Sequence, residues 1–486
     1  MAEPLKILFL ASEVAPFAKT GGLADVGGSL PKALAALGHE VRVVMPAYAQ
    51  VEAALGTGRW GVAASPLTLK VPMGAGPIDA GVLEAVIPGS EVRTWFIAER
   101  NLFGRPDLYG YGDDGYRFAF FARAALDLAV MVQGWRPDVV HVHDWHAAPA
   151  ALWLATAGEG DERYRQMPTV LTIHNLMHQG RSPWHLLEYL GVQTPALREE
   201  PYGQVNLLAR GIHHATKINT VSPTYAREIM TPDGGSGLDA LLRYRHFDVH
   251  GILNGLDYAV WDPSADTHLA QTYSVGSLAA RSANKRALQV RLGLPQRDDL
   301  PLVAMVTRLD RQKGLDITGH VVHLLMNGFA GDAQFVVLGS GASEYEDMFR
   351  HLAGYHSTRM AAVLGYDAAL APLVYAGSDM FLMPSLFEPC GLGQLIAMRY
   401  GSVPVVRATG GLADTVRDGV TGFTFTDYTV DDSWYALERA MYIFRFDKRS
   451  WRAVQKHGMT ADFSWETSAE GYQQLYEWAI ATARGW

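Results

Sequence analysis

The sequence lacks most of the features that mark specialised classes of protein. Its 486 residues contain one cysteine, Cys390, which excludes an internal disulfide and any zinc or iron–sulfur site built from several cysteines. No stretch approaches the 18 or so consecutive apolar residues of a membrane helix. The opening apolar run, residues 6–11, is too short for the hydrophobic region of a secretory signal. We therefore expect a protein of the cytoplasm that does not enter a membrane.

Long runs of one charge sign are also missing. The chain has 41 Lys and Arg against 50 Asp and Glu, a net charge of −9, so a broad basic surface for nucleic acid or anionic membrane is not predicted. An anionic ligand must instead be bound by a local cluster of cations. An apolar fraction of 49%, with 49 Gly and 24 Pro, excludes a disordered or collagen-like chain.

What the sequence does contain is a repeated alternation of short, β-branched runs with longer helical segments. This alternation predicts parallel sheets covered by helices on both faces. The expected strands are Ile7 to Ala11, Glu40 to Met45, Asp138 to Val142, Thr169 to Ile173, Lys217 to Val221, Leu302 to Val306, Phe335 to Leu338, Ala361 to Leu364, Met380 to Met383 and Val403 to Val406. Between Pro66 and Ile97 three runs follow one another without a helix, which predicts a hairpin-like insertion.

The length and the repeated pattern predict an α/β protein with two doubly wound, Rossmann-like domains that face each other across a deep cleft. We expect an N-terminal domain at residues 1–250 and a C-terminal domain at 251–460. A final helix within 461–486 should pack back on the N-terminal domain. Ligand sites of such domains lie at the carboxyl ends of the strands.

Two loops at expected strand ends carry cations. Lys19, Gly21 and Gly22 follow the first strand and open a helix, an arrangement that suits a phosphate group, although a tight turn with a solvated lysine is the simpler alternative. Arg308 and Lys313 lie in the corresponding loop of the second domain, where they could clamp a diphosphate or merely be solvated. Neither a dinucleotide fingerprint nor a P-loop is present.

Histidines gather at the end of another strand. His141, His143, Asp144 and His146 have a spacing that could bind a metal, which makes a metal-dependent hydrolase one alternative. However, the carboxylate falls one residue too early for the dinuclear hydrolase pattern, and the histidines could simply be paired with backbone groups. Asp144, together with His174 at the next strand end, is better placed to contact ligand hydroxyl groups.

A further turn contains Glu388, Cys390 and Gly391. The carboxylate could accept hydrogen bonds from sugar hydroxyls, or it could pair with the following helix N-terminus. Cys390 has no activating base beside it in the sequence and is expected to be a small buried thiol. Nearby, residues 409–414 repeat the Thr-Gly-Gly-Leu-Ala-Asp run of residues 20–25.

Taken together, these motifs resemble those of bacterial glycogen synthase and plant starch synthase, in the same order from residue 6 to about 475. The resemblance implies a GT-B type glycosyltransferase. It also implies transfer of glucose from ADP-glucose to the 4-hydroxyl at the non-reducing end of an α-1,4-glucan, with retention at the anomeric carbon and without a metal or other cofactor. No sequence feature separates ADP-glucose from UDP-glucose or predicts an oligomeric state.

The resemblance also implies roles for single residues. The implied donor contacts are Lys19, Gly22, Tyr111, Arg308, Lys313, Tyr366, Glu388, Cys390 and Gly391. Among them, Arg308 and Lys313 correspond to the diphosphate clamp, Tyr366 to the ring that stacks on the base, and Glu388 to the essential carboxylate. The residues implied in catalysis are Glu388, Lys313, Arg308, His174 and Asp144. Asp144 and Asn254 correspond to contacts with the acceptor or the transferred sugar.

One position departs from the wider superfamily, because Ile396 stands where many retaining relatives have a second glutamate. Without a second carboxylate, the implied mechanism is front-face return assisted by the departing phosphate. A non-enzymatic, two-domain sugar-binding protein is the other alternative. A sugar-binding protein of this kind would not need three cations placed to bind phosphate, and it would be expected to carry an export signal.

Overall fold

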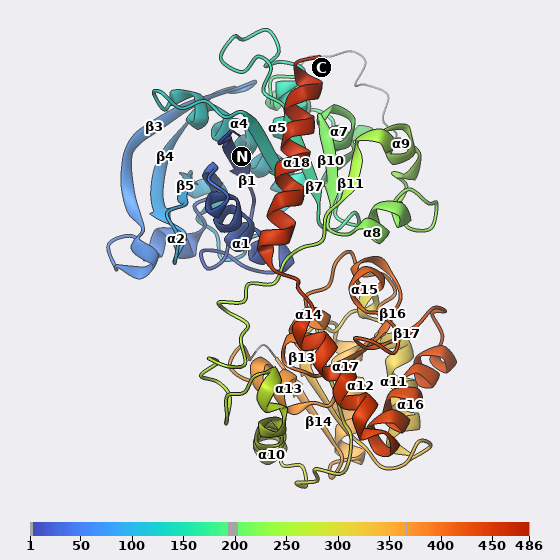
Figure 1. Ribbon diagram of the computed structural model, residues 1–486. Coiled ribbons are helices and arrows are strands. Elements are labelled where there is room, and N and C mark those ends of the chain that lie inside the picture. The colour runs from blue at the N-terminus through green and yellow to red at the C-terminus, as the bar shows by residue number, and fades with distance from the viewer. Residues whose placement is uncertain (1–2, 193–202, 366, 486) are drawn as a thin grey trace. The chain divides into compact units, whose positions relative to one another are not determined.

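A computed structural model describes residues 3–192, 203–365 and 367–485. The chain divides into two compact units, unit 1 (Met1–Gly255 with Trp465–Trp486) and unit 2 (Leu256–Ser464). The boundaries therefore follow Gly255 and Ser464, a few residues beyond the positions expected from the sequence. Helix α18 (Trp465–Ala483) packs against α1 (Gly22–Ala36) of unit 1, although the two helices lie at opposite ends of the chain (Figure 1).

Unit 1 is built on one mixed sheet, whose strand order over the described residues is β11-β10-β7-β6-β1-β2-β5-β4-β3. Its parallel strands are β1 (Lys6–Leu10), β2 (Glu40–Pro46), β5 (Arg93–Ala98), β6 (Val139–His143), β7 (Thr169–Ile173), β10 (Lys217–Thr220) and β11 (Val249–Gly251). The expected insertion is an antiparallel hairpin of β3 (Ala63–Met73) and β4 (Gly76–Val86). It joins the sheet because β4 pairs antiparallel with β5.

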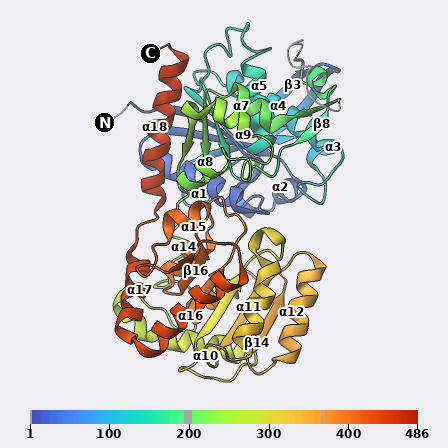
Figure 2. The same ribbon diagram turned by 90° about the vertical axis from the view of Figure 1, so that its right-hand side faces the viewer.

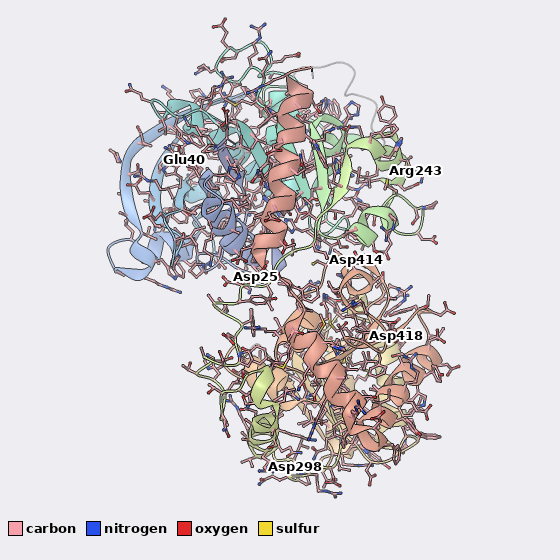
Figure 3. The ribbon with its side chains drawn as sticks, viewed as in Figure 1. Asp25, Glu40, Arg243, Asp298, Asp414 and Asp418 are labelled. Atoms are coloured by element: carbon pink, nitrogen blue, oxygen red, sulfur yellow. The ribbon has the colours of Figure 1, made fainter. Side chains whose placement is uncertain are left out.

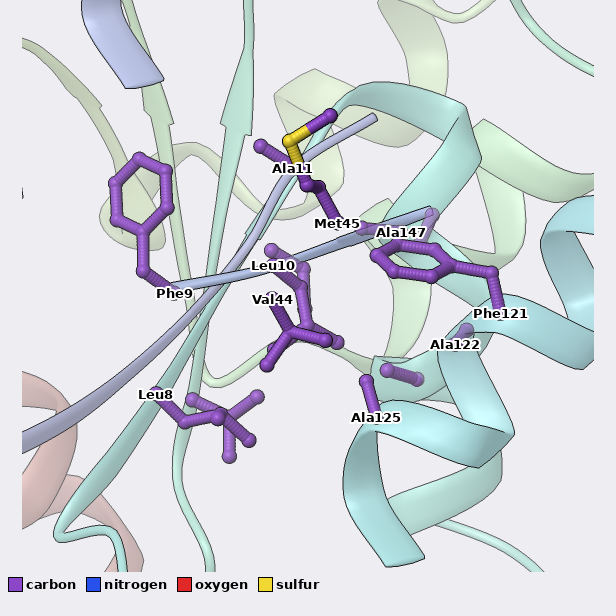
Figure 4. Packing of buried hydrophobic residues seen from close by; sticks show 14 of the residues in the cluster. Leu8, Phe9, Leu10, Ala11, Val44, Met45, Phe121, Ala122, Ala125 and Ala147 are labelled. Carbon is purple, nitrogen blue, oxygen red and sulfur yellow. The ribbon is translucent and has the colours of Figure 1, made fainter. Parts of the chain in front are cut away.

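Helices cover both faces of this sheet, which explains why β1 is apolar at nearly every position. Leu8 and Leu10 point to the side of the helices α4 (Asp114–Met131) and α5 (Asp144–Leu154), whereas Phe9 points to the opposite side (Figure 4). On that opposite side Phe9 meets the rings of His141 and His143. Alternation along a buried strand thus supplies apolar side chains to two separate layers.

Unit 2 contains a parallel sheet with the order β14-β13-β12-β15-β16-β17 among the described residues. The strands are β12 (Leu302–Val306), β13 (Gln334–Gly339), β14 (Met360–Leu364), β15 (Met380–Met383), β16 (Val403–Arg407) and β17 (Phe423–Phe425). Helices α11 (Leu315–Met326), α12 (Ser343–Tyr355) and α16 (Val430–Phe446) lie on one face (Figure 2). Helices α10 (Arg281–Arg291), α13 (Ala371–Gly377) and α14 (Gly393–Arg399) cover the other, and two apolar clusters fill the space above and below the sheet.

Shorter elements complete the two units. They are α2 (Ala49–Ala54), α3 (Arg100–Phe103), β8 (Arg181–Pro183), α6 (Leu186–Tyr189), β9 (Gln204–Asn206), α7 (Leu207–His214), α8 (Pro223–Glu228), α9 (Asp239–Tyr244), α15 (Gly410–Thr415) and α17 (Lys448–Thr460), with 3₁₀ turns η1 (Arg59–Gly61), η4 (His246–Asp248), η5 (Val275–Ala280) and η6 (Arg311–Lys313). None of the helices in the described ranges combines the length and apolar character needed to cross a bilayer.

The strands expected from the sequence are present, and each end differs from the expected one by one residue at most. Four three-residue strands in the described ranges, β8, β9, β11 and β17, were not predicted, because so short a run carries no periodicity to detect. In α1 the side chains of Leu23, Val26, Leu30 and Leu34 form a buried stripe at helical spacing. Leu37 caps the helix end and is 39% exposed.

The two-sided burial of β1 leads to a stability prediction. Leu8→Ala should lower the free energy of unfolding by about 2 to 5 kcal/mol, because it opens a cavity in a fully buried layer. Leu37→Ala, which removes the same atoms from an exposed site, should change it by less than about 0.5 kcal/mol. Urea unfolding followed by tryptophan fluorescence measures both. Equal losses would contradict the assignment of Leu8 to the core.

Candidate active site

Several of the predicted site residues lie in loops that follow two pairs of neighbouring strands, one pair in each unit. In unit 1, strand order reverses between β1 and β6, and the loops after these strands carry Lys19 and Asp144. In unit 2, the reversal lies between β12 and β15, and the following loops carry Lys313 and Glu388. Doubly wound sheets bind their ligands at this reversal, outside the carboxyl ends of the strands. Each unit therefore has one candidate site.

A buried carboxylate that sequence reasoning missed organises the loop after β1. The Glu13 side chain accepts hydrogen bonds from the backbone N–H and the hydroxyl of Thr20 and from the N–H of Gly21. Its Oε1 also accepts from the hydroxyl of Tyr109 at 2.8 Å. The first amides of the loop are thus already paired with an anion that the protein supplies. Glu13 was detectable by the rule that placed the others, since it follows β1 directly.

The glycines of this loop are not required by the fold. A Cβ atom at Gly21 or Gly22 would meet no heavy atom within 4 Å, and neither residue has a positive φ. Packing and backbone conformation therefore leave the space in front of both residues open. This is the arrangement expected where a ligand approaches the backbone closely.

The cation of the loop is paired within its own unit. Lys19 Nζ donates to Asp25 Oδ1 at 2.5 Å, and both side chains are substantially exposed. Figure 3 labels Asp25 near the start of α1 and Asp414 in α15, the matching positions of the repeated glycine turns. An exposed pair of this kind contributes little to stability, so an incoming phosphate can compete for Lys19.

Asp144 connects the ends of β6 and β7. Its Oδ1 accepts from the backbone N–H of His174 at 2.7 Å, and its own backbone has a φ of +53°. Burial raises the pKa of Asp144 to about 7, although the N–H groups of His174 and Asn175 oppose the shift. Burial lowers the pKa of His174 to about 3, so its imidazole is neutral at physiological pH.

The histidine cluster is paired with side chains rather than with the backbone groups that the sequence analysis considered. His141 bonds to Thr172 and Tyr476, and His143 bonds to His174. His146 packs against the ring of Tyr109 instead. Within the described part of the chain, no group of three or more His, Cys, Asp or Glu side chains is arranged to hold a metal ion.

Of the two tyrosines near this loop, the structure brings Tyr109 rather than Tyr111 to the site. Tyr109 reaches Ser12 and Glu13 with its hydroxyl. The hydroxyl of Tyr111 accepts from the backbone N–H of Asp107, and its ring lies between the guanidinium groups of Arg105 and Arg117. Tyr111 is therefore held within its own loop.

The remaining predicted residues have different surroundings. Asn254 is buried, and its amide oxygen has no hydrogen-bond partner among the described residues, which suits a group that awaits a ligand. Cys390 is buried, and Gly391 has a φ of +75°, so a left-handed turn requires the glycine. Tyr366 lies outside the described residues.

The site of unit 2 centres on a buried ion pair. Lys313 Nζ donates to both carboxylate oxygens of Glu388, at 2.9 and 2.7 Å, and the Ser385 hydroxyl donates to one of them at 2.9 Å. The Glu388 side chain is 6% exposed and that of Lys313 is 17% exposed. The helix that follows, α14, begins only at Gly393, so Glu388 pairs with a lysine and not with the helix terminus.

Close backbone contacts hold the two partners in place. Gly314 has a φ of +74°, and a Cβ there would lie 2.0 Å from the carbonyl oxygen of Pro384. The N–H of Leu386 donates to the carbonyl of Gln312 at 2.9 Å. On the other side, a Cβ at Gly410 would overlap the carbonyl oxygen of Glu388. The loops after β12, β15 and β16 are thus fitted around the Lys313–Glu388 pair.

Arg308 lies in the same loop as Lys313 but is held less firmly. Its guanidinium is 3.4 Å from Asp310 and 3.3 Å from the side-chain oxygen of Gln312, and the side chain is 58% exposed. Such a group can turn toward a ligand at little cost. The structure therefore brings Lys313, Glu388 and the Arg308 loop together in unit 2, while Lys19, Asp144 and His174 belong to unit 1.

Two doubly wound sheets, each with charged groups where its strand order reverses, are typical of glycosyltransferases of the GT-B type, and the comparisons with known proteins agree. Residues 6–244 match the family model described as starch synthase catalytic domain, and residues 291–442 match glycosyl transferases group 1. The chain belongs to the glycogen synthase and starch synthase family. Both alternatives to a glycosyltransferase, the metal-dependent hydrolase and the non-enzymatic sugar-binding protein, are therefore wrong.

The similarity extends over the full chain. Glycogen synthase of Moorella thermoacetica is 44% identical, covering 100% of this chain and 99% of its own, and that of Bacillus subtilis is 44% identical with 99% of each covered. The solved catalytic domain of starch synthase IV from Arabidopsis thaliana, bound to ADP and acarbose, is 33% identical with a TM-score of 0.88. It covers 99% of this chain and 100% of that one.

A more distant structure shows the fold alone. Sucrose-phosphate synthase from Thermosynechococcus elongatus is 17% identical, with a TM-score of 0.60 and coverage of 98% of this chain and 100% of that one.

The open space at Gly22 leads to a test of ligand approach. Gly22→Ala should raise the KM for ADP-glucose at least about tenfold, equivalent to about 1.4 kcal/mol, without lowering the melting temperature. Gly354→Ala is the matched control, because a Cβ there also meets nothing within 4 Å but the residue lies in α12. Steady-state kinetics and thermal unfolding measure both variants. An unchanged KM for Gly22→Ala would contradict ligand contact at this glycine.

The pKa of Asp144 leads to a prediction about stability. Because this pKa rises from 3.8 to about 7 on folding, the stability associated with the group is present at low pH and is lost as the pH rises toward 7. Asp144→Asn does not titrate. Its stability relative to the natural protein should therefore increase between pH 5 and pH 8, by on the order of 2 kcal/mol. Urea unfolding at the two pH values tests this, and a difference that is independent of pH would contradict it.

Proposed function

We propose that this protein transfers glucose from ADP-glucose to the 4-hydroxyl at the non-reducing end of an α-1,4-glucan, with retention at the anomeric carbon. The Lys313–Glu388 pair at the strand reversal of unit 2 carries the proposal, because it places a cation and a carboxylate where a doubly wound sheet binds its ligand. The starch synthase IV structure, which holds ADP and acarbose, supports both the nucleotide and the glucan.

In this proposal the cations of unit 2 stabilise the leaving diphosphate. Negative charge builds on the diphosphate as the bond to glucose breaks, and preformed positive charge lowers the energy of that transition state. Arg308, which is exposed and weakly held, can turn toward a phosphate. Lys313 is held by Glu388, so its ammonium group stays in one position when the diphosphate binds. That Lys19 of unit 1 contacts the same donor stays a prediction.

Glu388 has a second part in the proposal. With its charge balanced by Lys313 and one oxygen also bonded to Ser385, the carboxylate is preorganised to accept hydrogen bonds from the hydroxyls of the donor glucose. Cys390 and Gly391 shape the turn beside it. Ile396 is buried in α14 and has no nucleophilic atom, which favours the front-face mechanism over a covalent glucosyl intermediate.

The groups of unit 1 suit contacts with uncharged sugar. His174 is neutral, and Asp144 fixes its backbone, so the imidazole can be held against a hydroxyl of the transferred glucose. The unpaired amide oxygen of Asn254 suits a sugar hydroxyl of the glucose or the acceptor. Contacts of Tyr111 and Tyr366 with the donor, and a location in the cytoplasm, stay predictions.

The function is tested directly by chain extension. The purified protein should lengthen maltooligosaccharides when it is given radiolabelled ADP-glucose, and it should do so more slowly with UDP-glucose. Labelled products separated by length report the reaction, and digestion with an exo-acting α-1,4-glucosidase reports the linkage. Absence of extension with either donor would contradict the proposal.

Removal of the positive charge of Lys313 tests its proposed role in stabilising the leaving diphosphate. Lys313→Ala should lower kcat more than about 100-fold, the scale seen when one charge-stabilising group is lost. Arg311→Ala removes a neighbouring cation that is 75% exposed and 3.7 Å from its partner Asp316, and it should leave kcat nearly unchanged. Lys313→Arg keeps the charge and should retain part of the activity. An unchanged kcat in Lys313→Ala would count decisively against the clamp.

A further inference from the structure

Two buried imidazoles of unit 1 form a direct hydrogen bond. His143 Nδ1 lies 2.9 Å from His174 Nε2. His143 is fully buried at the end of β6, whereas His174 follows β7 and is partly accessible. His174 is the imidazole proposed to contact the sugar. Because it is hydrogen-bonded to His143, its orientation depends on a neighbour that lies entirely inside the protein. The inference below therefore rests on the proposed function.

His143 itself is held rigidly. Its ring packs against both Phe9 of β1 and His141 of β6, at centroid distances of 4.1 and 4.0 Å, and these two rings also contact each other at 5.2 Å. His141 is fixed in turn, because its Nδ1 bonds to the hydroxyl of Tyr476 at 2.8 Å and its Nε2 bonds to the hydroxyl of Thr172 at 2.7 Å. Tyr476 belongs to α18, so the last helix of the chain supports this layer of rings.

The proton between His143 and His174 has two possible positions. Burial lowers the pKa of both rings, so each carries one proton and only one of the two facing nitrogens bears an N–H. If His174 Nε2 were the donor, the proton of His143 would be on its Nε2. That atom is buried and has no hydrogen-bond partner among the described residues.

The two alternatives differ in what they leave unpaired. A buried N–H without an acceptor is rarer in proteins than a buried acceptor without a donor, because the N–H loses its bond to water and gains nothing. The arrangement with the proton on His143 Nδ1 leaves only a lone pair unpaired at Nε2. It is therefore the more stable of the two.

We propose that His143 is a positioning residue, whose Nδ1–H donates to His174 Nε2 and so holds His174 in the tautomer that carries its proton on Nδ1. His174 then presents an N–H, a hydrogen-bond donor, to the oxygen of a sugar hydroxyl. The opposite tautomer would present a lone pair instead. His143 thus decides which kind of hydrogen bond the sugar receives without touching the sugar.

Two substitutions at His143 distinguish the effect of losing the hydrogen bond from the effect of losing the volume of the ring. In His143→Asn the side-chain amide can donate from nearly the place of Nδ1, whereas His143→Leu fills the site without a donor. We expect His143→Leu to lower kcat about 10- to 100-fold, by analogy with the loss seen when a partner that orients a metal-binding histidine is removed. The KM for ADP-glucose should change little, and His143→Asn should retain most of the activity.

The tautomer can be read without any assay of transfer. Long-range ¹H–¹⁵N spectra of the full chain labelled at histidine distinguish Nδ1–H from Nε2–H, and the His174→Gln variant assigns the signal. We expect His174 to be protonated on Nδ1 in the natural protein and to lose that preference in His143→Leu. Protonation on Nε2 in the natural protein would overturn the proposal, even if His143→Leu failed to fold.

The outcomes separate this inference from the function on which it rests. Glucan extension by the natural protein together with equal kcat values for His143→Asn and His143→Leu would overturn the positioning role and leave the transferase standing. Failure of the natural protein to extend glucan would remove the proposed function, and the spectra would still decide the tautomer.

Discussion

The buried pair of Lys313 and Glu388 is the interaction around which unit 2 is arranged. The Glu388 carboxylate loses most of its contact with water on folding, and Lys313 and Ser385 offset that loss of hydration. The fit of three loops around the pair explains glycines at positions where any side chain would meet a neighbouring carbonyl oxygen, namely Gly314 and Gly410. A diphosphate that approaches Lys313 meets a cation already positioned and already shared with a carboxylate.

In unit 1, carboxylates also pair with the groups that are expected to bind phosphate, but the Lys19–Asp25 pair is more exposed than the pair of unit 2. Glu13 occupies the first amides of the glycine loop, and Lys19 is paired with Asp25 at the surface. In each unit, then, the protein supplies its own carboxylate beside the groups that are expected to bind phosphate. The pairs differ in burial, and this difference predicts which cation moves on binding: an exposed pair such as Lys19–Asp25 separates easily, whereas a buried pair keeps its geometry.

The fold could be predicted from the sequence because runs such as Leu302–Val306 are apolar throughout and alternate with helices. Candidate site residues could be predicted only where they belong to a recognisable sequence motif, as Lys19, Lys313 and Glu388 do. The position of Glu13 after a strand made it a possible site residue, but its contacts could not be predicted, because its partner Tyr109 is 96 residues away in the sequence. Tyr111 came from the family resemblance, and its contact with the donor stays a prediction. The hydroxyl of Tyr476 reaches His141 across 335 residues, a contact that only the packing of α18 defines.

In this proposal Glu388 holds Lys313 in place and also offsets part of the positive charge that a phosphate meets. Titration calorimetry with ADP on the natural protein and on Glu388→Gln measures the effect of that offset on binding. Glutamine keeps the size of the side chain and can still accept from Ser385, but it removes the charge that binds Lys313. Glu388→Gln should bind ADP about tenfold more tightly, a gain of about 1.4 kcal/mol. Binding that is unchanged or weaker would contradict it.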